Sequence, residues 1–293
     1  MNFDNSWDAV LKPGKATLYF DKLSDLKFEA DATSYSKINA WWLAELCRLI
    51  YREDIDESGD ATGPSRQEIL ESVNLQEVEF FNEGDTEAAL IKPMNSSSFA
   101  ALIFRGTTDL MDWLTDFRAF PVSWPAGGFV HEGFAEAIEL VQSRITASLK
   151  QNVPSGCPLF IAGHSLGAAL ATLAASLFKP RVLYDFGSPR VGDSEFAQSL
   201  NGISIYRVVN NRDVVTVVPP PVPFHHFGEL HYITHDGDVL TNPDDDTVAR
   251  DRLKRDRLAF FPDWHKLFTD APEPIADHAP VNYVAHLERS VEI

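Results

Sequence analysis

The sequence predicts a protein of the α/β class, with a central, mostly parallel sheet that carries helices on both faces. Between residues 99 and 209, strand-like apolar runs alternate with helix-like segments, which is the pattern of βαβ units around a buried sheet. Nothing in the 293 residues resembles an interdomain linker, internal repeat or low-complexity tract. We therefore expect one domain over residues 1–293, which is large but allowed for this class.

Hydrophobic spacing and turn residues set the order of the elements. Apolar positions at helical spacing predict helices over 36–51, 131–151 and 166–178. Strand-like runs separated by short turns predict an antiparallel N-terminal part over 77–81, 87–92 and 99–104. Apolar runs predict buried strands over 158–163, 181–187 and 204–209. We interpret residues 233–262 as a surface elaboration, since we can assign them no role.

Composition restricts the possible partners. The chain has 43 acidic and 25 basic residues and a formal net charge of −18, which disfavours nucleic acid and anionic bilayers as ligands. The only cysteines, Cys47 and Cys157, cannot form a disulfide framework, so the fold must depend on its core. We see no secretory signal and no transmembrane span, so we expect no transmembrane anchoring and leave the location open.

The stretch FIAGHSLGAAL, residues 160–170, places Ser165 between Gly163 and Gly167, after a predicted strand and before a predicted helix. The motif G-x-S-x-G is weak evidence alone, but this setting is that of a nucleophilic serine on a sharp turn. The two glycines let strand and helix approach, and the turn presents the hydroxyl to a substrate. The alternative is a serine that only caps the helix.

A serine hydroxyl needs a base and an acid that orients the base. In this arrangement the acid and then the base follow the serine in the chain. Asp213, just past the strand at 204–209, is the preferred acid; Asp185 lies within a strand and Asp193 is placed to cap a short helix.

Several histidines are candidates for the base, and spacing alone does not choose between His226 and His278. The candidates are His164, His225, His226, His231, His265, His278 and His286. The cluster of His225, His226 and His231 also resembles a metal-binding group. No cysteine or ordered carboxylate completes such a site, so we expect no metal.

Six stretches, in order along the chain, together resemble the class 3, or fungal-type, lipases of the α/β-hydrolase fold. They are FRGTTDLMDWLTDF (104–117), VHEGF (130–134), GHSLGAAL (163–170), YDFGSPRVGD (184–193), YRVVNNRDVVTVVPP (206–220) and DHAPVNYV (277–284). The chain departs from the secreted members of that family in its lack of a visible secretion signal and of enough cysteines for their disulfides.

The resemblance implies a catalytic triad of Ser165, Asp213 and His278, because the family's base lies in a late Asp-His block followed by a tyrosine. Here that block is Asp277–His278, with Tyr283 following. It also implies an oxyanion hole formed by Thr107 and, as the residue after the nucleophile, Leu166.

The resemblance further implies a short lid helix around residues 109–117. Its apolar residues at helical spacing would cover the site or contact lipid; they are Leu110, Trp113, Leu114 and Phe117. The alternative is an ordinary surface helix packed on the core.

The expected function is therefore carboxylic ester hydrolysis through an acyl-enzyme, with triacylglycerol as the favoured substrate. The expected partners are an ester or lipid substrate and, transiently, a lipid–water interface, and no cofactor is needed. Alternatives on the same scaffold are a short-chain carboxylesterase, a phospholipase or a feruloyl-type esterase. The alternative from a different class is a non-catalytic lipase-like scaffold that binds a partner.

Overall fold

The structure is a computed structural model that describes residues 3–16, 18–55, 62–107, 110–111, 120–254 and 269–292. Its helices are α1 (Trp7–Leu11), α2 (Lys37–Leu49), α3 (Arg66–Ser72), α5 (Glu132–Asn152), α6 (Leu166–Phe178), α7 (Asp245–Arg252), α9 (Glu273–Ala276) and α10 (Pro280–Glu292). The main strands are β1 (Leu75–Glu83), β2 (Thr86–Pro93), β3 (Ala100–Phe104), β6 (Leu159–His164), β7 (Val182–Phe186), β8 (Ser204–Asn210), β9 (Glu229–Ile233) and β10 (Val239–Thr241). Two short strands, β4 (Pro121–Ser123) and β5 (Phe129–His131), pair separately.

The main sheet has the order β1-β2-β3-β6-β7-β8-β9-β10. Strands β3, β6, β7, β8 and β9 run parallel to one another, whereas β1-β2, β2-β3 and β9-β10 are antiparallel pairs. The mostly parallel sheet and its antiparallel N-terminal part are confirmed, as are the predicted helices and strands to within a few residues.

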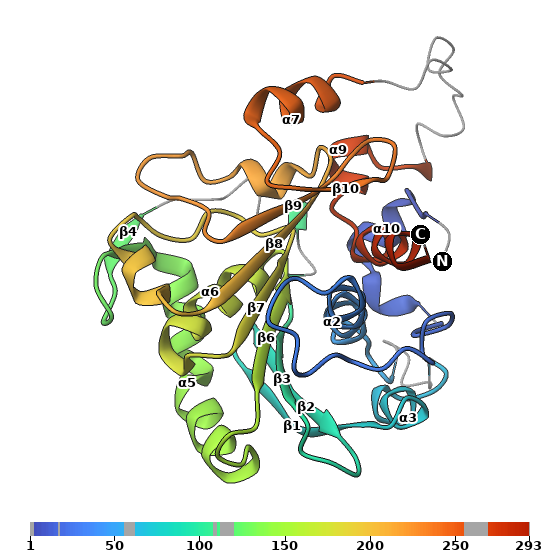
Figure 1. Ribbon diagram of the computed structural model, residues 1–293, viewed down its shortest axis with the longest axis vertical. Coiled ribbons are helices and arrows are strands. Elements are labelled where there is room, and N and C mark those ends of the chain that lie inside the picture. Colours follow the sequence, from blue (N-terminus) through green and yellow to red (C-terminus); the bar gives the residue numbers. More distant parts are fainter. Residues whose placement is uncertain are drawn as a thin grey trace.

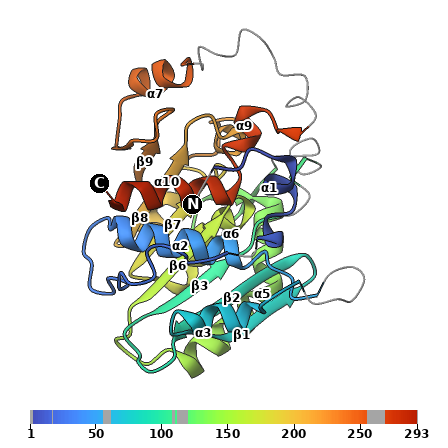
Figure 2. The same cartoon turned by 90° about the vertical axis from the view of Figure 1, so that its right-hand side faces the viewer.

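Helices cover both faces of this sheet, as Figures 1 and 2 show: α2 and α10 lie on one side, and α5 and α6 on the other. Alternate residues of each strand supply the two cores. In β6, Phe160 and Ala162 pack with α2 and α10, while Ile161 packs with α5 and α6. This burial on both sides explains why the central strands are continuous apolar runs.

The interpretation of residues 233–262 as a surface elaboration is incomplete. The chain there continues the central sheet through the β9–β10 hairpin, in which Ile233 pairs with Val239. It then forms α7, which lies beyond the end of the sheet in Figure 1. Residues 255–268, including the candidate His265, lie outside the described residues.

Candidate active site

Ser165 lies at the sharp turn between β6 and α6, at the carboxyl edge of the parallel strands. Its backbone has φ 61° and ψ −130°, a region that costs a non-glycine residue on the order of 1–3 kcal/mol. The flanking glycines make this turn possible, as predicted. A Cβ on Gly163 would lie 2.1 Å from the carbonyl oxygen of Gly167, and a Cβ on Gly167 would lie 2.3 Å from that of Phe104.

His278, in the loop between α9 and α10, contacts the carboxylate of Asp213. Its Nδ1 lies 2.9 Å from both Oδ1 and Oδ2 of Asp213. Because a carboxylate only accepts, Nδ1 carries the hydrogen and Nε2 is left to accept a proton. Both side chains are buried, so this hydrogen bond is shielded from water.

The structure brings the serine and the histidine into the same buried region. The rings of His164 and His278 lie 4.6 Å apart between centroids, and His164 directly precedes Ser165. Ser165 is 1% exposed and His278 is 2% exposed. Ser165 Oγ and His278 Nε2 each lack a hydrogen bond to any described residue, so the serine–histidine bond is open here. Catalytic hydrogen bonds commonly tighten only when substrate binds.

The carboxylate of Asp213 has two further donors. The hydroxyl of Tyr283, on α10, donates to Oδ2 at 2.6 Å, and the backbone N–H of Val215 donates to Oδ1 at 2.9 Å. A Cβ on Gly187 would lie 2.6 Å from Asp213 Oδ2 and 3.2 Å from His278 Nδ1. The end of β7 therefore needs a glycine to make room for this contact.

His164 links the segment just after α2 to the loop of His278. Its Nε2 donates to the backbone carbonyl of His278 at 2.8 Å, and the hydroxyl of Tyr51 donates to its Nδ1 at 3.1 Å. Burial and, to a lesser degree, the neighbouring His278 lower the pKa of His164 well below its ordinary value, so this ring stays neutral. Sequence reasoning missed Tyr51, because only tertiary contact brings it to this place.

The candidate oxyanion residues lie beside the serine. The loop that leads to Thr107 passes so close that a Cβ on Gly106 would lie 3.0 Å from Ser165 Cβ and 2.2 Å from the Tyr51 hydroxyl. Leu166 is the first residue of α6, so its N–H lies at the positive end of that helix. An N–H at such a position is the kind of donor that stabilises negative charge on an attacked carbonyl.

Of the candidate lid residues, the structure describes only Leu110; Trp113, Leu114 and Phe117 lie outside the described residues. Leu110 is buried in a small apolar cluster with residues from α1, from the segment after Asp213 and from the segments flanking His278. The cluster consists of Val10, Leu110, Val215, Ala271, Ala276 and Ala279.

Two of the other candidates make structural contacts. His226 Nε2 bonds the backbone carbonyl of Thr216 at 2.8 Å, and burial lowers the pKa of this imidazole to about 3. Asp193 accepts from the N–H of Phe196 at 2.8 Å, as expected for a cap. Within the described residues no His, Cys, Asp and Glu side chains gather in a group that could hold a metal ion.

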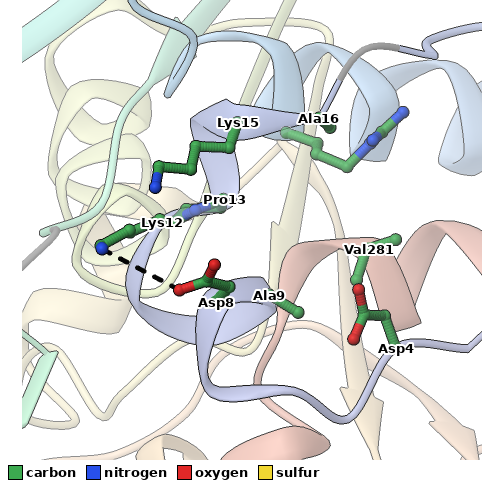
Figure 3. Close-up of a pocket in the computed structure, with 9 residues that line it drawn as sticks. Asp4, Asp8, Ala9, Lys12, Pro13, Lys15, Ala16 and Val281 are labelled. Carbon is green, nitrogen blue, oxygen red and sulfur yellow. Dashed lines mark ion pairs between the residues drawn. The ribbon is translucent and has the colours of Figure 1, made fainter. Parts of the chain in front are cut away.

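A pocket of about 180 Å³ lies between the N-terminal segment, α2 and the start of α10 (Figure 3). Its charged lining residues are Asp4, Asp8, Lys12, Lys15 and Arg48. Asp8 pairs with Lys12 at 4.0 Å, and Arg48 pairs with the buried Glu45 at 2.7 Å. Neither Ser165 nor His278 lines this pocket, so it is separate from the candidate site.

Comparison with known proteins assigns the family. The model of the lipase (class 3) family matches residues 101–222. The solved structure of the triacylglyceride lipase from Rhizomucor miehei is 31% identical, with a TM-score of 0.53, over 58% of this chain and 71% of that chain. This chain belongs to the class 3 lipase family. The α/β fold with its antiparallel N-terminal strands matches the fungal lipase structures.

Curated relatives match in part. The lipase of Rhizomucor miehei is 35% identical over 50% of this chain and 45% of that protein. The chloroplastic phospholipase A(1) DAD1 of Arabidopsis thaliana is 34% identical over 40% of this chain and 32% of that protein. The match thus spans less than half the length of these curated relatives. Among the described segments, no helix combines the length and apolar character that crossing a bilayer requires.

Proposed function

We propose that this class 3 lipase family protein hydrolyses carboxylic esters of lipids, with triacylglycerol as its preferred substrate. The observation that carries the proposal is the strained, buried Ser165 beside a histidine whose Nδ1 lies 2.9 Å from the Asp213 carboxylate. A strained serine next to an oriented imidazole is the arrangement that acyl transfer requires. No resident cofactor or metal enters this mechanism.

In the proposed reaction His278 removes the proton of Ser165 as the serine attacks the ester carbonyl. Asp213 orients the imidazole and stabilises its cationic form, while Thr107 and the N–H of Leu166 stabilise the oxyanion; losing one such donor typically costs about 2.7–4 kcal/mol. His278 then protonates the leaving alcohol, and water repeats the sequence to release a fatty acid.

We also propose that a cover over Ser165 opens to admit the substrate. Ser165 is 1% exposed, so an ester carbonyl can reach it only after neighbouring residues move. We propose that Leu110 is part of this cover; it packs with Val215 and Ala279, which lie two residues after Asp213 and one residue after His278. We propose that Trp113, Leu114 and Phe117 extend the cover as a lid and contact lipid when it opens. We also propose that residues 1–293 form one domain.

Rates on p-nitrophenyl esters from acetate to palmitate, on emulsified triacylglycerol and on phosphatidylcholine test the proposal. We expect rates to rise with acyl length and to be highest on the emulsion. Preference for the phospholipid would favour the second candidate, a phospholipase A1, which one relative's name supports. Preference for acetate with no gain on emulsions would reject lipid ester hydrolysis in favour of a short-chain esterase.

A further inference from the structure

The loop that carries Asp213 contains a strained residue that is held from outside the active site. Asn211 has φ +32°, in the left-handed region that non-glycine residues rarely adopt. Its side-chain Nδ2 donates to Asp251 Oδ2 at 3.0 Å, and its backbone carbonyl accepts from Arg252 Nε at 2.9 Å. Both Asp251 and Arg252 belong to the last turn of α7. The end of this helix therefore holds the backbone and the side chain of Asn211 together.

Asp251 is itself fixed in place. It is 5% exposed, and its Oδ2 also accepts from the hydroxyl of Tyr232 at 3.1 Å and from the N–H of His235 at 2.8 Å. Its Oδ1 forms an ion pair with Lys254 Nζ at 2.9 Å. A carboxylate with this many directional partners cannot follow the loop if the loop relaxes. Asp251 is thus a rigid support for Asn211.

The same helix end also reaches the segment of His278, through Arg212. Arg212 Nε donates to the backbone carbonyl of Arg252 at 2.7 Å, and its N–H donates to Asp277 Oδ2 at 3.0 Å. Asp277 directly precedes His278. Residues 211 and 212 therefore lie between α7 on one side and the histidine segment on the other, and the aspartate follows at once at position 213.

We propose that Asp251 and Arg252 are positioning residues for the reaction: they hold Asn211 in its left-handed conformation and so fix Asp213 against His278. The inference rests on the proposed catalytic role of Asp213 and His278. It assigns a role to α7, which sequence reasoning left without one. Without the bond from Asp251, the loop relaxes toward an ordinary backbone conformation. The carboxylate two residues later then turns away from the imidazole.

The first test compares Asp251→Asn with the matched control Asp236→Asn. Asp236 bonds the same Lys254 Nζ, at 2.6 Å, but its side chain is 62% exposed. With a soluble p-nitrophenyl ester, we expect Asp251→Asn to lower kcat roughly 10- to 100-fold with KM within about twofold, because misplaced catalytic groups lose rate rather than ground-state binding. We expect Asp236→Asn to retain both constants. Equal kcat values for the two variants would overturn the inference.

A second variant guards against loss of folding in Asp251→Asn. Asn211→Ala removes the bond to Asp251 and leaves a residue that disfavours a positive φ, so we expect a similar fall in kcat. If Asp251 acts through Asn211, the double variant loses no more than either single variant; full additivity would contradict that route.

A third measurement does not depend on ester hydrolysis. The hydrogen on His278 Nδ1 should give a downfield proton resonance, assigned by its loss in His278→Ala. We expect this signal to shift or broaden in Asp251→Asn and to stay unchanged in Asp236→Asn; an unchanged signal in both would reject the inference. If the signal responds but the unmodified protein hydrolyses no ester, the proposed function fails while the positioning role stands.

Discussion

At the scale of single residues, the hydroxyl of Tyr283 is the contact with the clearest consequence for activity. It donates to Asp213 Oδ2 at 2.6 Å and accepts from the N–H of Asn210 at 3.1 Å. A hydrogen bond to a charged group typically contributes about 1.5–3 kcal/mol. Removing this one leaves the carboxylate with one orienting contact fewer.

We therefore expect Tyr283→Phe to lower kcat by roughly tenfold with little change in KM. The control is Tyr35→Phe, because the buried hydroxyl of Tyr35 has no hydrogen bond to the described residues. Steady-state kinetics on a soluble ester decides the point. Equal kcat values for the two variants would show that the Tyr283 hydroxyl does not support Asp213.

Asp185 gives a residue-scale prediction for stability. Burial raises its pKa from 3.8 to about 8, against the opposing effects of the Thr172 hydroxyl at 3.2 Å and of the Arg207 charge. Because the folded value exceeds the unfolded one, the stabilisation is fully present below about pH 3.8 and is lost as the pH rises through about 8.

Asp185→Asn removes this ionisation. The melting temperature of the variant relative to wild type should rise by roughly 5 °C between pH 5 and pH 9. Thermal unfolding followed by circular dichroism measures the difference, with the exposed Asp236→Asn as control. A difference that is constant with pH would contradict a carboxyl that folds in its neutral form.

At the scale of elements, the strand–turn–helix unit β6–α6 depends on its two glycines. Gly163→Ala would place a Cβ 2.1 Å from the carbonyl oxygen of Gly167, which forces strand and helix apart. We expect a loss of about 1–3 kcal/mol in the free energy of unfolding and a large loss of activity. Gly133→Ala is the control, because its nearest neighbour would be 3.5 Å away on His131. Urea unfolding of both variants gives the comparison, and equal stabilities would contradict the close approach.

The elements differ in how far the sequence predicts them. The sequence predicts the central strands because burial on both faces of the sheet leaves uninterrupted apolar runs, and it predicts α6 because its residues are almost all apolar. The helix α7, DDTVARDR, has no apolar stripe; it is held by the carboxylate of Asp251 and the guanidinium of Arg252. Hydrophobic periodicity cannot detect an element that docks through polar contacts. Likewise, spacing alone left the base open between His226 and His278, since three-dimensional contact separates them.

At the scale of the whole molecule, the net charge of −18 influences which lipid surfaces the protein can approach. Like charges repel over a distance of about 8 Å at physiological ionic strength. We expect the hydrolysis rate on a neutral emulsion to fall as anionic phospholipid is added, and to recover in part in high salt. A rate that rises with anionic lipid would show that a local basic surface outweighs the overall charge.

Covalent labelling with a fluorophosphonate shows whether Ser165 is a nucleophile that His278 activates. Mass spectrometry of the labelled peptides should find one adduct, on Ser165. Labelling should slow by roughly 10³-fold or more in His278→Ala and stay near wild type in His226→Ala. An unlabelled protein, an adduct on another serine, or a reversed response of the two histidine variants would rule out this pair of nucleophile and base.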